Sequence, residues 1–416
     1  LKRNTRDKMQ FIYNIKNSES QYTVEQIQEA IDAFKNSVRF DFIKTLDDKS
    51  LISSTLEIYE QFKDRTNFVQ VGIGGSSLGP EMLIKAIKRT DKNFYFLNNI
   101  DTDHTVETLK SFDIKDSIFY VVSKSGGTAE TMAQMAIITN TLLEKGVKES
   151  ELSKYFVFCT DPVESSLKDL AQELGIKYLT VPSNVGGRFS VLTPVGLLPA
   201  LFAGIDIELM NSSASQFANK FIDSDELIKL TQTVLDLHHS GVNETVLMPY
   251  SSKLRELSFW FVQLWAESLG KKKGSDRVGL TPIPSYGATD QHSQMQLFME
   301  GPRNKLLFMV HVENCQHELK LTNSFNHSKL KKLNNFSLKN LMDAEFFGTL
   351  KALDEQEIPY IHLGIESVSE KSLSELILLF EILTAITGLT LKIDPFDQPG
   401  VEAGKIYSFE WLDKSL

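Results

Sequence analysis

Short apolar segments alternate with segments of helical composition along the first half of this chain, and this alternation constrains the fold most strongly. Several of the apolar segments are continuous hydrophobic runs, as expected for strands in a sheet that is covered on both faces. The expected strands are residues 68–73, 94–97, 117–122, 155–159 and 178–181, and the expected helices are residues 80–88, 105–112, 129–145 and 164–174. Strands that alternate with helices form parallel βαβ units, so the sequence predicts a doubly wound α/β sheet.

A second set of such segments begins near residue 245. It contains strands at 245–248, 306–311 and 360–363, and helices at 254–269 and 373–387. Further helices are expected at 24–42, where apolar residues recur at helical spacing, at 188–204 and from about Val401. We therefore predict two α/β domains that divide within residues 203–244. The expected segments are a helical N-terminus (1–45), a first α/β domain (46–205), a second α/β domain (206–392) and a C-terminal helix (393–416).

The composition argues against several classes of binding partner and indicates a cellular location. A net charge of −10 and a pI near 5.4 argue against nucleic acid, although a local basic pocket can still hold an anionic ligand. Cys159 and Cys315 lie in or beside apolar strand-like runs, so we expect buried free thiols and a reducing, cytoplasmic location. We find no uncharged apolar segment long enough for a membrane span, no signal peptide and no metal-ligand spacing such as HExxH or CxxC.

The loop at residues 123–128, Ser-Lys-Ser-Gly-Gly-Thr, lies between an expected strand and an expected helix. The first amides of a helix have no partner within the helix and point outward at its positive end, where an anion can bind them. Ser123, Ser125 and Thr128 add hydroxyl donors, and Lys124 adds a positive charge. The alternative is an ordinary turn in which Thr128 caps the helix. Three hydroxyls and a lysine together favour a phosphate-binding loop.

A second glycine-rich loop, residues 72–79, follows the first expected strand. It resembles a dinucleotide-binding fingerprint but has Ser77 where GxGxxG requires its third glycine, and it lacks the Gly-Lys-Ser/Thr of a P-loop. By itself it is a tight turn. Ligands of doubly wound sheets bind at the carboxyl ends of strands, so this loop and the 123–128 loop are expected to border one pocket.

Four further segments carry side chains suited to chemistry. Arg188 follows a glycine pair and could stabilise an oxyanion, Glu267 ends an apolar helix and could act as a general base, and His292 lies in a polar segment. Gln398 and Lys405 flank the start of the last helix. Each residue alone has a simpler explanation: a salt-bridge partner, a solvated helix end, a structural histidine or a polar helix start.

Taken together, these segments resemble the glucose-6-phosphate isomerase (phosphoglucose isomerase) family in its shorter bacterial type. Residues 186–190 (Gly-Gly-Arg-Phe-Ser) and 396–405 (Phe-Asp-Gln-Pro-Gly-Val-Glu-Ala-Gly-Lys) look like the two signature segments of that family. Residues 72–80, 123–128, 267–271 and 291–293 match it in the same order. The resemblance runs from about residue 68 to 405 and implies a pair of sugar-isomerase (SIS) domains, each a doubly wound α/β sandwich, with no cofactor and no metal.

The resemblance also implies a role for each residue in converting an aldose 6-phosphate to a ketose 6-phosphate through a cis-enediol(ate). Glu267 matches the base that moves the proton between C1 and C2, and Arg188 matches the residue that stabilises the enediolate. His292, given by the partner subunit of a homodimer, and Lys405 match the groups that assist ring opening. Ser123, Lys124, Ser125 and Thr128 match the phosphate loop, and Gly75, Ser76 and Gln398 match further substrate contacts. The run at residues 271–273 is expected to be a solvated loop without a role.

Two rival interpretations stay open at this point. One is another sugar-phosphate isomerase of the same fold, acting on amino sugars or also on mannose 6-phosphate. The other is a sugar-phosphate sensor without catalytic activity, but such regulators usually carry a DNA-binding helical domain, which the acidic charge and short N-terminus do not support.

Overall fold

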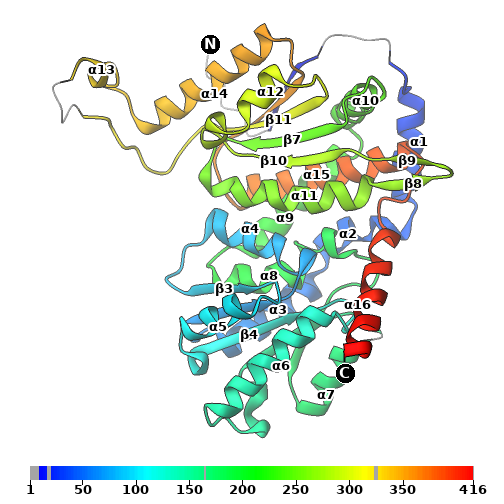
Figure 1. Ribbon diagram of the computed structural model, residues 1–416, viewed down its shortest axis with the longest axis vertical. Helices are drawn as coiled ribbons and strands as arrows, with labels where there is room; N and C mark the ends of the chain where they lie inside the picture. Colours follow the sequence, from blue (N-terminus) through cyan, green and yellow to red (C-terminus); the bar gives the residue numbers. More distant parts are fainter. Residues whose placement is uncertain (1–8, 16–19, 164, 323–326, 416) are drawn as a thin grey trace.

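Two five-stranded sheets lie one above the other in the computed structural model, with helices between them (Figure 1). The structure describes residues 9–15, 20–163, 165–322 and 327–415. Both sheets are mainly parallel and covered by helices. The expected α/β class is therefore confirmed.

The first sheet has the strand order β3-β2-β4-β5-β6, and all of its strands are parallel. Its strands are β2 (Asn67–Val71), β3 (Asn93–Leu97), β4 (Ser117–Val122), β5 (Phe156–Thr160) and β6 (Lys177–Thr180). Its helices are α3 (Lys49–Phe62), α4 (Leu78–Ile87), α5 (Thr102–Lys110), α6 (Ala129–Glu144), α7 (Ser166–Leu174) and α8 (Pro194–Phe202). Every strand predicted here is present. Helix α3 was not predicted, and Glu164, the expected start of α7, lies outside the described residues.

The second sheet has the order β1-β12-β11-β7-β10, in which only β1 runs antiparallel to its neighbour. Its strands are β1 (Gln10–Asn14), β7 (Glu244–Pro249), β10 (Thr281–Pro284), β11 (Lys305–Val312) and β12 (Tyr360–Ile365). Its helices are α9 (Ile207–Phe221), α10 (Asp225–His239), α11 (Arg255–Leu269), α12 (Met295–Glu300), α13 (Ser328–Lys331), α14 (Leu338–Glu355) and α15 (Glu370–Thr390). A hairpin of β8 (Lys271–Lys273) and β9 (Asp276–Val278) extends from the end of α11.

The N-terminal segment departs from the expectation of one helix over residues 24–42. Helix α1 (Val24–Lys35) begins at a capping box between Thr23 and Gln26 and ends at Asn36, and the short α2 (Asp41–Lys44) follows. The purely helical N-terminus is also wrong, because β1 pairs with β12 of the second sheet. The N-terminal segment therefore contributes a strand to the second sheet, whose other strands all come from residues 244–365.

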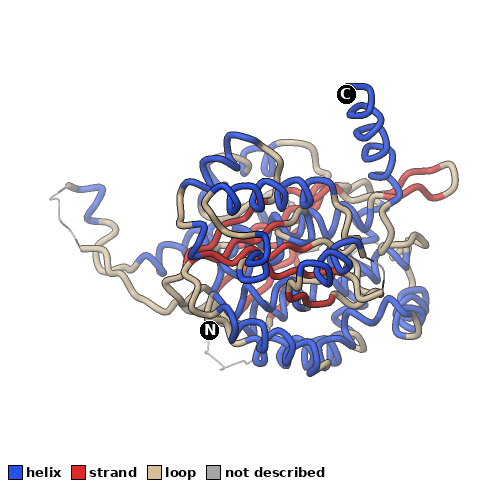
Figure 2. Tube along the Cα trace, turned by 90° about the horizontal axis from the view of Figure 1, so that it is seen from below, coloured by secondary structure: helices blue, strands red, loops and turns tan. Residues whose placement is uncertain are grey.

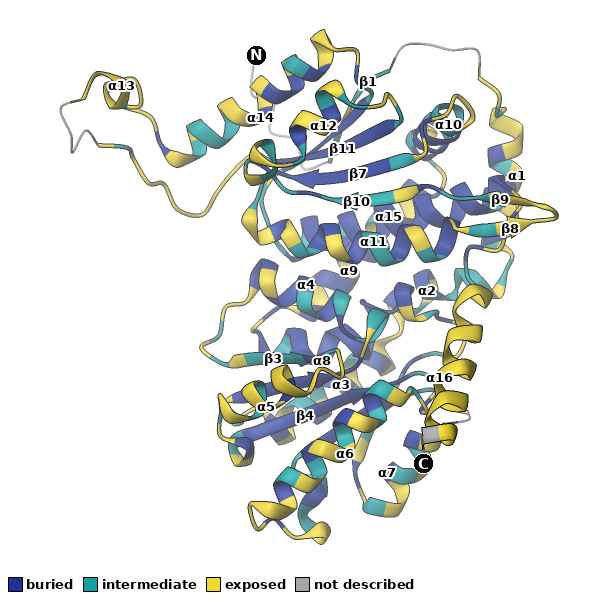
Figure 3. Ribbon diagram, viewed as in Figure 1, coloured by how far each residue is buried: buried dark blue, intermediate teal, exposed yellow. Residues whose placement is uncertain are grey.

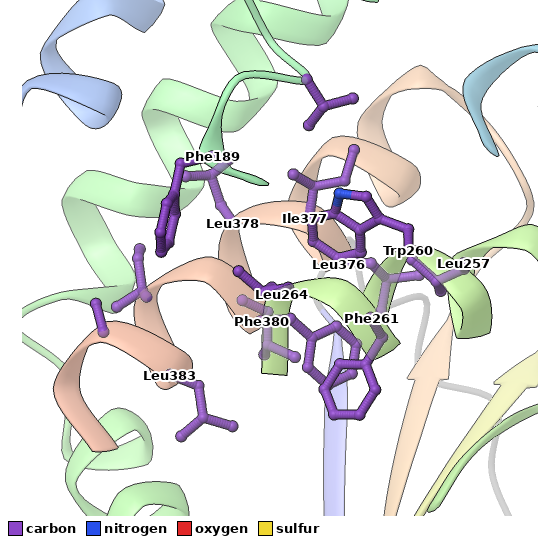
Figure 4. Packing of buried hydrophobic residues seen from close by; sticks show 14 of the residues in the cluster. Phe189, Leu257, Trp260, Phe261, Leu264, Leu376, Ile377, Leu378, Phe380 and Leu383 are labelled. Atoms are coloured by element: carbon purple, nitrogen blue, oxygen red, sulfur yellow. The ribbon is translucent and has the colours of Figure 1, made fainter. Parts of the chain in front are cut away.

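The largest hydrophobic cluster lies between the two sheets. It joins residues of α4, α8, α9, α11 and α15, and Figure 4 shows Phe261, Leu264 and Phe380 packed at its centre. Within the described chain, α15 is the one helix long and apolar enough to cross a membrane, and 89% of that apolar window is buried inside the protein. Because the helix is buried on all sides along this window, α15 is the central core helix.

The two cysteines have different environments. Cys159 in β5 is fully buried, as expected, and burial raises the pKa of its thiol to about 12. Cys315 is exposed, because β11 ends at Val312 and the chain leaves the sheet before reaching it. The expectation of a buried thiol at Cys315 is therefore wrong.

Candidate active site

The carboxyl ends of β2 and β4 form the point where the strand order of the first sheet reverses. The chain passes from β2 to β3 on one side and then crosses to β4 on the other side. Open α/β sheets bind ligands in the crevice at such a point. Residues 72–79 follow β2 and residues 123–128 follow β4, so the structure brings both predicted loops to this crevice.

The 123–128 loop is held by hydrogen bonds among its own hydroxyl groups. Ser123 Oγ lies 2.9 Å from Thr128 Oγ1, and Ser125 Oγ lies 3.4 Å from the same atom. Thr128 is the N-cap residue of α6, yet its side chain makes no capping hydrogen bond. Its hydroxyl faces the loop instead of closing the helix, which favours the anion-binding interpretation over the simple capped turn.

Lys124 links this loop to the one that follows β6. Its Nζ donates to the carbonyl oxygens of Ser183 (2.6 Å) and Val185 (2.8 Å). Burial lowers the pKa of Lys124, and the nearby Asp161 carboxylate acts against that shift. The lysine thus holds the 123–128 loop against the segment that carries Arg188.

Gly126 gives a testable expectation for this loop. Its φ is +70°, and a Cβ there would overlap Ser165 Oγ. We expect Gly126→Ala to lower the free energy of unfolding by about 2 kcal/mol or more, because it combines left-handed strain with a steric clash. Urea denaturation measures the loss. Gly127→Ala is the matched control, since nothing lies within 4 Å of a Cβ there. Equal stability of the two variants would contradict the loop geometry.

The glycine loop after β2 meets both the Arg188 segment and helix α11. A Cβ on Gly75 would overlap the carbonyl of Gly187, and Gly74, at φ +61°, faces the side-chain amide of Gln263 in α11. Only glycine allows this close approach of two backbones. Gly75 and Ser76 therefore lie beside Arg188.

Arg188 is buried, with 4% of its surface exposed, and each of its nitrogens is occupied. Nε donates to Ser268 Oγ (2.7 Å), and NH1 donates to Gln398 Oε1 (3.0 Å). NH2 donates to the carbonyl oxygens of Pro395 (2.6 Å) and Asp397 (3.0 Å). Burial lowers the pKa of this guanidinium, and the Glu267 and Asp397 carboxylates act in the opposite direction. The arginine is a fixed cation with a fixed orientation.

Glu267 lies beside this cation, in the last turn of α11. Its Oε2 is 3.4 Å from Arg188 NH1 and accepts a hydrogen bond from Gln263 Nε2 (3.3 Å). About a quarter of the carboxylate side chain stays exposed, and it opens into a cavity of about 810 Å³. The other lining residues come from α11 and its C-cap, from the hairpin and from the turn before the last helix: Gln263, Ala266, Gly270, Lys271, Lys272, Arg277, Val278, Asp394, Asp397, Gln398, Pro399, Gly400 and Val401.

Three contributors to this site were missed in the sequence. Gln263 precedes Glu267 by one helical turn on the same face of α11, a spacing that could have revealed it. Ser268 orients Arg188. Lys271 was expected to be solvated, but only 7% of its side chain is exposed and its Nζ pairs with Asp397 Oδ1 at 2.7 Å, so that expectation is wrong for Lys271. Lys272 and Lys273 are exposed.

His292 lies elsewhere in the same chain. It is exposed in a short 3-10 turn (Thr289–His292) that follows β10, and the adjacent Gln291 donates to Tyr250 at the carboxyl end of β7 (2.7 Å). Helix α11 begins near that end of β7 and carries Glu267 away over roughly 18 Å. His292 and Glu267 of one chain are therefore at opposite ends of α11.

Lys405 lies in the first turn of the last helix, α16 (Glu402–Ser415), which projects from the body of the protein (Figure 2). Its Nζ pairs with Glu402 Oε1 at 2.8 Å, and the helix is exposed along its length (Figure 3). Among the described residues, the cavity includes Gln398 and Val401 but neither Lys405 nor His292. The structure therefore joins Arg188, Glu267 and Gln398, and leaves Lys405 and His292 outside.

No group of three or more His, Cys, Asp or Glu side chains that could hold a metal ion occurs in the part of the chain that the structure describes. The chemistry that the arrangement offers comes from a carboxylate that is held against a guanidinium at the wall of the cavity. A carboxylate can take up and return a proton, and a fixed cation can stabilise charge that develops beside it.

Known proteins are similar to this chain over most of its length. The phosphoglucose isomerase family model matches residues 40–414. A glucose-6-phosphate isomerase of Carboxydothermus hydrogenoformans is 37% identical over 378 residues, covering 86% of this chain and 80% of that protein. A crystal structure of a hypothetical protein from Thermus thermophilus superposes with a TM-score of 0.86 at 33% identity and covers 94% of each chain. A Chlamydia trachomatis glucose-6-phosphate isomerase, 22% identical, shares the fold with a TM-score of 0.75 over 90% of this chain and 74% of that one.

Proposed function

The chain belongs to the phosphoglucose isomerase family, and on this premise we propose that it interconverts glucose 6-phosphate and fructose 6-phosphate. The observation that carries the proposal is the Glu267 carboxylate, held 3.4 Å from the buried Arg188 guanidinium at the wall of the cavity. The reaction moves one proton between C1 and C2 of the open-chain sugar. A carboxylate beside a fixed cation is suited to that transfer, and no cofactor is needed.

In the proposed mechanism, Glu267 removes the C2 proton of the open-chain aldose. The electron pair of the broken C–H bond forms the C1=C2 double bond of a cis-enediolate, and the charge that develops on O1 lies near Arg188. Protonated Glu267 then returns the proton to C1, while the O2 proton passes to O1 and C2 becomes the ketone. Arg188 is already oriented by Ser268, Pro395 and Asp397, so it stabilises the enediolate without reorganising.

We propose that the 123–128 loop binds the 6-phosphate, which takes no part in the bond changes. Support comes from the hydroxyls of Ser123, Ser125 and Thr128, which face one another at the uncapped start of α6. Gly75, Ser76 and Gln398 are proposed to contact the sugar between this loop and Glu267. Binding energy from the phosphate then orients C1 and C2 at the base.

We propose that ring opening uses His292 of the second subunit of a homodimer, together with Lys405. The positions of Glu267 and His292 at opposite ends of α11 support a site shared between subunits, because one chain does not bring the two together. A C2 dimer places the same patch of each subunit on the other, so two such sites are formed at once. We also propose a cytoplasmic location, supported by the unpaired thiols of Cys159 and Cys315.

A coupled assay tests the activity itself. Fructose 6-phosphate is supplied, and glucose 6-phosphate is followed through NADP reduction by glucose-6-phosphate dehydrogenase. We expect turnover with fructose 6-phosphate. Mannose 6-phosphate and glucosamine 6-phosphate, supplied in parallel assays, separate the proposed activity from the rival isomerases. Binding of fructose 6-phosphate without turnover would instead support the sensor interpretation.

Mixed dimers test the shared site. Glu267→Gln and His292→Ala proteins are each expected to be nearly inactive, but a mixture that is dissociated and reassociated should recover about a quarter of the wild-type activity. Half of the randomly formed dimers are then mixed, and each holds one site with both native residues. Native mass spectrometry verifies that mixed dimers form. Their inactivity would contradict a site shared between subunits.

A further inference from the structure

We propose that Lys271 is a positioning residue for the isomerisation: its ion pair with Asp397 locks the turn that orients Arg188 and Gln398 against Glu267. This inference rests on the proposed function and adds a residue to it. Lys271 is the first residue of the β8 hairpin strand and lies four residues after Glu267, next to the end of the helix that carries the base.

The contacts of Lys271 all lead to Asp397. Its Nζ pairs with Asp397 Oδ1 at 2.7 Å and also donates to the Asp397 carbonyl oxygen. That same carbonyl accepts a hydrogen bond from Arg188 NH2 (3.0 Å). Only 7% of the lysine side chain is exposed, so solvent screens the pair little on that side. One backbone oxygen thus connects Lys271 and Arg188.

The turn at residues 394–400 is held on one side by the hydrogen bonds from Arg188 to Pro395, Asp397 and Gln398. Its inner side is held by Phe396, which packs against Phe34 and Phe189 at ring-centroid distances of 5.9 and 5.2 Å. Its cavity side carries Asp397 and Gln398, and next to them Gly400 has open space around it. Lys271 is the cation that holds this side to the end of α11.

The pair also controls charge in the cavity. Like Asp394, Asp397 places a carboxylate near enough to act on the charge of Arg188, in addition to Glu267. Without Lys271, that carboxylate is free to compete with Glu267 for the guanidinium. Removal of the ammonium should therefore displace Arg188 and Gln398 from the reacting carbons without changing the 123–128 loop.

Lys271→Met tests this role, because a positioning residue should affect kcat much more than KM. We expect kcat for fructose 6-phosphate to fall by about 10- to 100-fold, because small displacements of oriented groups cost this much, while KM changes less than about threefold. Lys271→Arg should restore most of kcat, since it keeps a cation that can reach Asp397. Lys273→Met, an exposed lysine of the same strand outside the cavity, is the matched control and should behave as wild type.

A double-mutant cycle identifies the partner. If Lys271 acts through the Asp397 carboxylate, Asp397→Asn lowers kcat as well, and the double variant is no worse than the more impaired single variant. Additive losses would overturn the proposal, as would a wild-type kcat in Lys271→Met. A lower melting temperature with unchanged kcat would show a structural role only and would also overturn it. Wild-type protein without isomerase turnover would refute the proposed function itself, a different outcome from an active but unaffected variant.

Discussion

Glu267→Gln is expected to lower kcat for fructose 6-phosphate by about 10³- to 10⁴-fold. The amide has nearly the size and shape of the carboxylate but cannot accept a proton from carbon. The hydrogen bond from Gln263 can be kept, whereas the charge opposite Arg188 is lost. Steady-state kinetics in the coupled assay measure the loss.

Binding and chemistry should separate in this variant. Fructose 6-phosphate should still raise the melting temperature of Glu267→Gln, because the proposed phosphate contacts lie in the 123–128 loop and not on α11. Exchange of the C2 or C1 hydrogen with deuterated water, followed by NMR, should be lost together with turnover. Full turnover in the Gln variant would show that another group is the base. Loss of the thermal shift would show that Glu267 is needed for binding.

Arg188→Lys is expected to lower kcat by about 10²- to 10³-fold, although it preserves the charge. The single ammonium of lysine cannot replace the three guanidinium nitrogens, which together donate to four separate acceptors. These acceptors are Ser268 Oγ, Gln398 Oε1 and the carbonyl oxygens of Pro395 and Asp397. Arg188→Met should in addition lower the free energy of unfolding by about 3 kcal/mol, since it leaves buried acceptors unpaired. Kinetics and urea denaturation test the two effects.

Arg89→Lys provides a matched control for the second prediction. Arg89 also makes a two-pronged pair, with Glu370 at the start of α15, but it lies outside the cavity. We expect a modest change in stability and the wild-type kcat. If Arg188→Lys kept the wild-type kcat as well, the guanidinium would not be the group that stabilises the enediolate.

Several parts of the fold could be predicted because they depend on local patterns. Residues 117–122 are a continuous apolar run, and the strand β4 has the predicted bounds. Strand β10 was missed because its sequence Thr-Pro-Ile-Pro has two prolines, which a sheet tolerates only at an edge, and β10 is an edge strand. Strand β1 was missed because its partner, β12, lies some 350 residues away in sequence.

For the candidate site as well, some contacts could be predicted from the sequence and others could not. The loops at residues 72–79 and 123–128 could be placed together, because the carboxyl ends of parallel strands meet at one edge of a sheet. The contact of Arg188 with the 394–400 turn could not be derived from local pattern, since it joins segments more than 200 residues apart. The covered position of the Lys271 side chain could not be predicted either, because a run of three lysines is typical of a solvated loop.

The sequence by itself determined the strand–helix alternation, the α/β class and the chemistry available at each strand end, because these follow from residue type and short-range periodicity. The tertiary structure alone decided which of these groups meet. It brought Glu267, Gln398 and Lys271 to one cavity beside the buried Arg188, and it separated His292 from Glu267 by the length of α11. The physical reason is that these contacts form only when the two sheets pack across their shared core.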